Sequence, residues 1–357
     1  MGGSQNWDDR LIRAGEASMA MEALSVAACP DEPQRFFDFF LNAASDRSTL
    51  QPLYGIRGER RLAEDELDHL EGYRHSQPVR IGTDGGPEVH LGVYGEVLGA
   101  AWVVRDQLSD RRGALAPATA GLLVDLADLA ARRWRRPDTD LWGRPGPNRH
   151  LLHSKLLCWV ALERAVHLGP LLQARGRGHR WERAREEIRA TILGEGWDDG
   201  LGAYSAVMGD AELDASVLLM PIVGFLPAED ERMRATIEAV ARHLTDEEGL
   251  VRRYPHDEGG PRSTCSFWLV QCLALMGELE RAEALFATVV AHANDVGLLA
   301  DGLGPRGELL GNFPHTASHA GLVNAVAALA RARAELDNDD DDCQLSASAP
   351  PAGGSNR

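Results

Sequence analysis

The chain has 357 residues, of which 44% are hydrophobic, so it has enough apolar side chains for a large core in one or two domains. Its formal net charge of −17 disfavours binding to nucleic acids and to anionic membranes. The sequence contains no apolar run long enough to span a membrane, and its polar beginning lacks the apolar core of a secretory signal. We therefore expect a cytoplasmic protein.

Helical periodicity dominates the chain and occurs in two alternating kinds of segment. Some segments are apolar nearly all round, which is typical of helices that are buried on most sides. They cover residues 16–28, 93–104, 150–162, 211–225, 263–277 and 317–332. Between them lie amphipathic segments, which have one apolar stripe and one polar face. These cover residues 33–44, 119–134, 178–194, 230–245 and 279–293.

This alternation predicts an all-α (α/α)6 toroid, in which six inner helices are surrounded by an outer ring of which five helices are recognised. The twelfth helix is not recognised in the sequence. We assign residues 1–336 to the toroid. Residues 337–357 form an acidic run followed by Ser, Ala, Pro and Gly, a composition that is typical of a disordered tail.

The connections from each outer helix to the next inner helix all open at one end of such a toroid, which we call the mouth. They cover residues 1–16, 47–88, 137–148, 195–210, 246–262 and 294–316. Long loops of this kind usually carry function, so we expect a small molecule to bind at the mouth. The five cysteines lack zinc-type spacing, and we expect neither a metal nor an organic cofactor.

Several motifs follow one another in a fixed order between residues 6 and 334. They include NWDDR at 6–10, YGEVLGA at 94–100, RHLLHSKLLCWVALERA at 149–165 and CSFWLVQCLALMGELERAEALF at 265–286. Together they resemble glycoside hydrolase family 15, which includes glucoamylases, glucodextranases and bacterial trehalases. The resemblance implies a six-hairpin barrel and inverting hydrolysis by two carboxyl groups. Bacterial members usually carry an N-terminal β-sandwich as well, which we expect this chain to lack.

The chain departs from the family pattern at the positions that carry the chemistry. Gly143 stands where the family has its general acid, and Asp301 stands where it has a glutamate as general base. Gly15 and Glu16 replace the Arg–Asp pair that grips the terminal sugar. Loss of a general acid alone typically removes about 10²–10⁴ of the rate. We therefore expect little or no glucose release from maltose, starch or trehalose.

The residues that remain at the mouth include groups that can transfer protons. Asp301 is a candidate base, and Glu16 is a candidate replacement for the missing acid. His153 and His315 are candidate acid–base groups because histidine titrates near neutrality. Candidate substrate-binding residues are Trp7, Asp8, Tyr73, Arg80, Trp142, Arg149, Lys155 and His319.

Some of these residues also have purely structural interpretations. In these interpretations, Trp7 and Trp142 serve only as part of the wall of the toroid, and His319 is a core histidine with satisfied hydrogen bonds. Lys155 is the only lysine of the chain. Side chains two residues apart on a helix project about 200° apart, so we expect His153 to face the ligand while Lys155 anchors the helix start against a carboxylate.

Three functions are compatible with these residues. The first, which we expect, is acid–base chemistry on a small sugar-derived or natural-product molecule, namely isomerisation, elimination or cyclisation. The second is carbohydrate hydrolysis in which Glu16, Asp8 or Asp9 substitutes for the missing acid. The third is an inactive protein that binds sugar. In each case the partner is a small molecule, not nucleic acid or membrane, and the sequence leaves the oligomeric state open.

Overall fold

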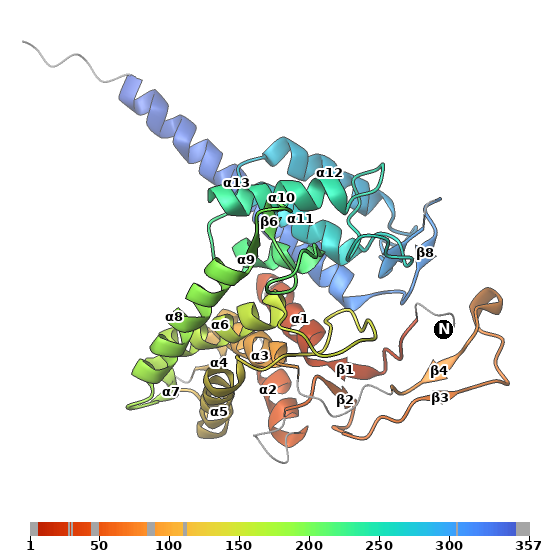
Figure 1. Cartoon of the computed structure of the whole chain (residues 1–357), viewed down its shortest axis with the longest axis horizontal. Coiled ribbons are helices and arrows are strands. Elements are labelled where there is room, and N and C mark those ends of the chain that lie inside the picture. The colour runs from red at the N-terminus through yellow and green to blue at the C-terminus, as the bar shows by residue number, and fades with distance from the viewer. Residues whose placement is uncertain are drawn as a thin grey trace, which may run out of the picture.

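The computed structural model describes residues 6–27, 29, 31–43, 50–83, 90–109, 113–304 and 306–347. The described chain is mostly helical, with short strands at its edges (Figure 1). The inner elements are α1 (Ala14–Val26), α3 (Gly92–Val103), α6 (Leu152–His167), η2 (Ala215–Leu218) followed by α9 (Leu219–Ile222), α11 (Ser263–Leu275) and α13 (Thr316–Ala347). The outer helices are α2 (Glu32–Ala43), α5 (Pro117–Arg133), α8 (Gly178–Glu195), α10 (Glu231–His243) and α12 (Leu279–Ala291).

The inner elements contact one another in chain order, and the last contacts the first. α1 contacts α3, α3 contacts α6, and α6 contacts η2. η2 and α9 contact α11, α11 contacts α13, and α13 contacts α1, which closes the ring. The predicted toroid is therefore confirmed, and within the described ranges no twelfth long helix follows α13. The short elements η1 (Tyr73–His75), α4 (Arg105–Leu108) and α7 (Gly169–Leu172) lie in the connections.

The two rings differ in how much of each helix is buried, as the sequence pattern predicts. In the inner helix α11, every residue from Ser263 to Ala274 is buried. The outer helix α10 buries a single stripe that includes Met233, Ile237 and Val240. Spacings of three and four residues place those side chains on one helix face, so α10 packs against the inner ring and leaves its charged face in water.

The fourth inner helix is shorter than the sequence predicts. Residues 211–225 are apolar nearly all round, but only residues 215–222 are helical. Asp214 caps the start of η2, because its side chain accepts a hydrogen bond from the Ser216 N–H. Gly224, with a φ of 79°, lies just beyond α9 in a conformation that ends a helix. Local capping therefore overrides the apolar pattern at both ends of this element.

The last inner helix extends beyond the toroid. α13 runs to Ala347 and projects away from the body (Figure 1). The disorder of residues 337–357 stays a prediction, and residues 348–357 lie outside the described residues. No helix in the described part of the chain combines the length and the apolar character needed to cross a membrane.

In the part of the chain that the structure describes, eight short strands form four antiparallel pairs in the predicted mouth connections. β1 (Leu11–Arg13) pairs with β2 (Leu53–Gly55), and β3 (Asp65–Glu66) pairs with β4 (Arg80–Ile81). β5 (Trp197–Asp198) pairs with β6 (Ala203–Tyr204), and β7 (Gly302–Leu303) pairs with β8 (Leu309–Leu310). In Figure 1, β1 to β4 and β8 lie on the same side of the molecule as the N-terminal segment. These pairs give the mouth a fixed backbone on which site residues can be held.

Candidate active site

Three predicted catalytic residues come together at the mouth. Glu16 lies in the first turn of α1, Asp301 lies just before β7, and His315 immediately precedes α13. The His315 Nδ1 is 3.8 Å from Asp301 Oδ1, and the charges of both residues act on Glu16. Segments that are almost 300 residues apart in the sequence therefore contribute to one acidic site.

Asp301 is held in place from two sides. Arg262 donates a hydrogen bond from Nη1 to Asp301 Oδ2 at 2.8 Å, and only 3% of the Arg262 side chain is exposed. The Asp301 N–H donates to the Asn312 carbonyl, and the Ser263 N–H donates to the Asp301 carbonyl. The second carboxylate oxygen, Oδ1, faces His315. A carboxylate that is fixed in this way keeps one oxygen available for a proton.

Glu16 has the electrostatic character of a proton donor. Burial raises the pKa of its carboxyl group, and the charges of Asp9 and Asp301 raise it further. Arg13 opposes this shift, with Nε 3.5 Å from Glu16 Oε1. Glu16 therefore stays protonated at a higher pH than an ordinary glutamate does.

A fourth acidic residue, Glu96, was missed in the search for site residues. It lies in the middle of α3, and burial raises the pKa of its carboxyl group to about 7, with further contributions from Asp138 and Glu16. A Cβ atom added to Gly15 would lie 2.7 Å from Glu96 Oε1, so the carboxyl group reaches the start of α1. The feature of the sequence that points to Glu96 as a site residue is the presence of a glutamate in an otherwise apolar inner helix.

His153 lies on the Glu96 side of the site. The residue is only 8% exposed, and burial lowers the pKa of its imidazole to about 4. The expectation that His153 titrates near neutrality is therefore wrong, because the low-dielectric surroundings disfavour the charged ring. His153 makes no hydrogen bond or ion pair with Asp301 or His315 in the described structure, so the predicted grouping of these three residues is not formed by direct contact.

Lys155 is buried within the protein. Only 2% of it is exposed, and its Nζ donates to the carbonyl oxygens of Trp134 and Arg136, each at 2.5 Å. These carbonyls follow the C-terminus of α5. The predicted anchoring role fits this geometry, but the partners are backbone carbonyls and not the carboxylate that we expected. An assignment of Lys155 to substrate binding does not fit its burial.

The N-terminal segment is fastened to the loop that holds Asp301. The Trp7 N–H donates to Asn312 Oδ1 at 2.8 Å, and Asn312 Nδ2 donates to the Trp7 carbonyl at 3.1 Å. Trp7 itself is 46% exposed at the mouth. The neighbouring Asp8 accepts hydrogen bonds from Arg10 and from the Gly82 N–H, and these partners lower the pKa of its carboxyl group to about 2. Asp8 is therefore a poor substitute for the missing acid.

The loop that contains Gly143 is organised around Trp142. The Trp142 indole donates to Asp214 Oδ2 at 2.9 Å, and its ring lies 6.3 Å from that of Trp268. Gly143 has a φ of 72°, in the left-handed region that favours glycine. A glutamate at 143 would therefore be strained in this backbone conformation.

Four other predicted binding residues have partners within the protein. Arg149 donates from Nη1 to Glu212 Oε2 at 2.8 Å. His319 Nε2 accepts a hydrogen bond from the Leu299 N–H at 3.1 Å, which matches the structural alternative for this histidine. Arg80 pairs with Glu64 and Glu66 on the β3–β4 hairpin. Tyr73 is 68% exposed near the tip of the same hairpin.

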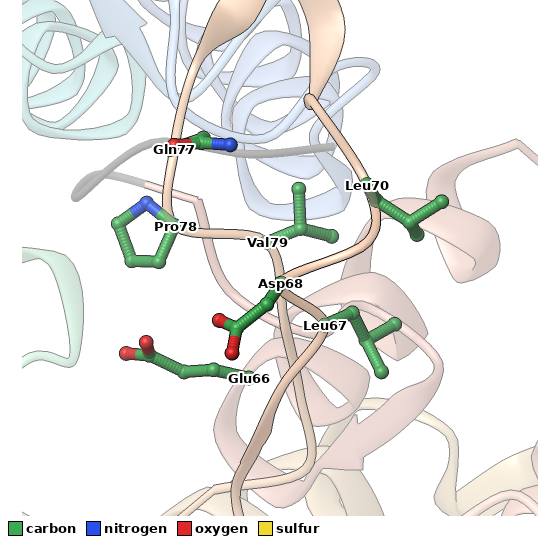
Figure 2. Close-up of a pocket in the computed structure, with 7 residues that line it drawn as sticks. All are labelled: Glu66, Leu67, Asp68, Leu70, Gln77, Pro78 and Val79. Carbon is green, nitrogen blue, oxygen red and sulfur yellow. The ribbon is translucent and has the colours of Figure 1, made fainter.

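The same hairpin forms an open surface groove apart from Asp301. The groove is lined by Glu66, Leu67, Asp68, Leu70, Gln77, Pro78 and Val79. Figure 2 shows the carboxylates of Glu66 and Asp68 pointing to the same side as Pro78, away from the side chain of Leu70. No three His, Cys, Asp or Glu side chains in the described ranges are arranged to hold a metal ion.

The sequence matches the family described as Glycosyl hydrolases family 15 over residues 17–327, and the chain belongs to this family. It is 37% identical to a trehalase of Mycolicibacterium smegmatis, over 92% of this chain and 50% of the relative. It is 36% identical to a trehalase of Mycobacterium tuberculosis, over 92% of this chain and 49% of the relative. The chain thus spans about half the length of these relatives.

Solved structures share the fold at low sequence identity. A glycosidase superposes with a TM-score of 0.72 at 18% identity, covering 90% of this chain and 88% of its own. A bacterial glucoamylase complexed with acarbose superposes with a TM-score of 0.67 at 13% identity, covering 90% of this chain and 49% of its own. The toroid is therefore an architecture that these carbohydrate-processing proteins have in common.

Proposed function

We propose that this chain hydrolyses a glycosidic bond in a small carbohydrate, with Glu16 as the proton donor and Asp301 as the base. The proposal rests on one observation: these two carboxyl groups lie at the same site, but their surroundings differ. Burial favours the protonated form of Glu16, whereas Asp301 is paired with Arg262. Two carboxyl groups whose surroundings differ in this way are suited to opposite proton-transfer roles.

The chemistry follows the inverting mechanism. Glu16 donates its proton to the glycosidic oxygen as the bond to the anomeric carbon breaks. Asp301 removes a proton from the water that attacks that carbon from the opposite face. Arg262 and His315 act as positioning residues, because they fix the orientation of the Asp301 carboxylate.

Family membership and the named relatives favour hydrolysis over the isomerisation, elimination or cyclisation that we first expected from the sequence. Trehalose is the first substrate to assay, because the relatives at 37% and 36% identity are trehalases. We expect turnover below the ordinary range of about 1–10³ s⁻¹. Gly143 supplies no acid, and Asp301 is one methylene shorter than the family's base.

Glu16→Gln is expected to separate bond cleavage that needs an acid from cleavage that does not. The variant should lower kcat/KM for trehalose by about 10²-fold or more. It should leave the hydrolysis of α-glucosyl fluoride nearly unchanged, because fluoride departs without a proton while water still attacks the anomeric carbon. Glucose release and fluoride release measure the two rates, and NMR of the first product identifies the β-anomer that inversion gives.

Glu22→Gln is the matched control for this experiment. Glu22 lies on the same helix, and burial raises the pKa of its carboxyl group too. Its carboxyl group accepts a hydrogen bond from Asn324, and Glu22 is not one of the residues grouped with Asp301 and His315. Its replacement should change neither rate. If Glu16→Gln lowers the hydrolysis rates of trehalose and of α-glucosyl fluoride equally, Glu16 is not the acid. Failure of the unmodified chain to hydrolyse either substrate would overturn the proposed function.

A further inference from the structure

Glu96 and His153 approach the same glycine on α3. A Cβ atom added to Gly92 would lie 3.4 Å from His153 Cε1 and 3.6 Å from Glu96 Oε1. The two side chains thus come from neighbouring inner helices and converge on one place without forming an ion pair with each other. We call the region formed by Glu96, His153, Gly15 and Gly92 the floor of the site.

Both polar side chains of the floor lack a partner among the described residues. His153 is more than nine-tenths buried, yet neither ring nitrogen takes part in a hydrogen bond within the described structure. Glu96 likewise has no hydrogen bond or ion pair there, although the residues around it on α3 are buried. His153 is buried and Glu96 is partly exposed. Two converging polar groups without a protein partner are free to bind the polar groups of a ligand.

The charges around Glu96 are of one sign. Burial raises the pKa of its carboxyl group, and Asp138 before α6 and Glu16 on α1 raise it further; among the described residues no cation offsets them. On α5, Arg133 donates to the hydroxyl group of Tyr94. On α6, Lys155 is engaged by backbone carbonyls. The floor therefore has acceptors and negative potential, but no positive side chain of its own.

We propose that the floor binds the ammonium group of an amino sugar, so that the carbohydrate recognised by this site carries a basic nitrogen. An ammonium group has three N–H donors. It can donate to the Glu96 carboxylate and to a nitrogen of the neutral His153 ring, which satisfies both groups at once. A neutral hydroxyl group would form these hydrogen bonds without neutralising the charge. This inference rests on the proposed function for the location of the sugar, but its test does not need turnover.

Gly15 adds a second reason to expect a ligand cation. The motif that this segment resembles has an arginine at this position, and here the residue has no side chain. The Glu96 carboxyl group extends to within 2.7 Å of the Cβ position of Gly15. Position 15 of this chain therefore supplies no positive charge to the Glu96 carboxyl group.

Calorimetric titration of the full chain with glucose and with its 2-, 3- and 6-amino-deoxy analogues tests the proposal. At least one analogue should bind about tenfold to a hundredfold more tightly than glucose. The ammonium group favours the ionised form of Glu96, whose pKa is about 7. Binding should therefore release protons at pH 6 and fewer at pH 7, and affinity should rise across this interval, in which the sugar amine is still mostly protonated. Titrations in buffers of different ionisation enthalpy measure the released protons.

Two variants should remove the preference for the amino sugar, each by a different route. Glu96→Gln removes the charge, and Gly15→Arg supplies a protein cation to the same carboxyl group. The three atoms nearest to a Cβ atom at position 15 all belong to the flexible end of Glu96, which can shift. Unfolding temperatures close to that of the parent chain show that both variants are folded. Glu22→Gln, the control on the far part of α1, should keep the preference.

The outcomes distinguish this inference from the proposed function. Equal affinity for glucose and all three analogues, or a preference that survives in Glu96→Gln, would overturn the ammonium site and leave hydrolysis intact. Absence of binding by every sugar would overturn the ammonium site. That result together with no hydrolysis of trehalose or glucosyl fluoride would overturn the proposed function as well.

Discussion

Replacing Lys155 with methionine is expected to lower the free energy of unfolding by about 2–4 kcal/mol. Methionine preserves most of the buried aliphatic stem but removes the ammonium group that donates to the carbonyls of Trp134 and Arg136. A buried polar group that loses its partner costs about 1–3 kcal/mol. Two carbonyls are affected, and relief from burying a charge offsets part of the loss. Urea denaturation followed by circular dichroism measures the change.

The Lys155→Arg variant separates charge from shape. It retains the positive charge, but its planar guanidinium needs a wider space than the compact ammonium. We therefore expect this variant to be destabilised as well. Arg132→Met on the exposed face of α5 is the control, and it should stay within about 0.5 kcal/mol of the parent chain. A Lys155→Met variant as stable as this control would show that the ammonium group does not fasten α5 to α6.

The arrangement of helices could be predicted because burial leaves a strong pattern in the sequence. Inner helices such as α11 are surrounded by protein and are apolar all round, whereas outer helices such as α10 bury one stripe. The fourth inner element shows the limit of this reasoning. Its apolar pattern extends over 211–225, but the cap at Asp214 and the left-handed Gly224 reduce the helix to eight residues.

The candidate site could be predicted only where a motif marks it. Glu16, Asp301 and His315 lie at motif positions, and the structure brings them together. Glu96 lies within the YGEVLGA motif, but the sequence does not single it out, because helical periodicity places an inner helix in the core. Hydropathy cannot show whether a single glutamate in such a helix faces a neighbouring helix or the central space of the ring.

The partners of a polar residue were the least predictable feature. Lys155 was expected to meet a carboxylate, but the end of α5 places two carbonyls within its reach. Asp8 was considered as an acid, but Arg10 and the Gly82 N–H keep it ionised. These outcomes depend on which backbone groups are left unsatisfied at helix ends and loops, and side-chain spacing in the sequence does not contain that information.

Asp301→Asn is expected to abolish hydrolysis of both trehalose and α-glucosyl fluoride, with a loss of about 10²–10⁴ in kcat. An asparagine oxygen can still accept the hydrogen bond from Arg262, so the fold should be kept. The amide cannot remove a proton from water, and both substrates need that step. This pattern differs from that of Glu16→Gln, which should spare the fluoride. Fluoride release measures the loss, with unfolding temperature as a check on structure.

Rescue of a smaller side chain at position 301 by an external anion distinguishes a catalytic base from a residue that only supports the structure. Asp301→Ala leaves room for azide, an anion that attacks the anomeric carbon of α-glucosyl fluoride without transferring a proton, displaces fluoride and forms β-glucosyl azide. Addition of azide should therefore restore fluoride release in this variant and give that product by mass spectrometry. Glu308→Gln, a control in the adjacent β7–β8 hairpin where Glu308 pairs with Arg306, should need no azide. An Asp301→Ala variant that azide does not rescue, or an Asp301→Asn variant with near-normal turnover, would show that another group activates the water.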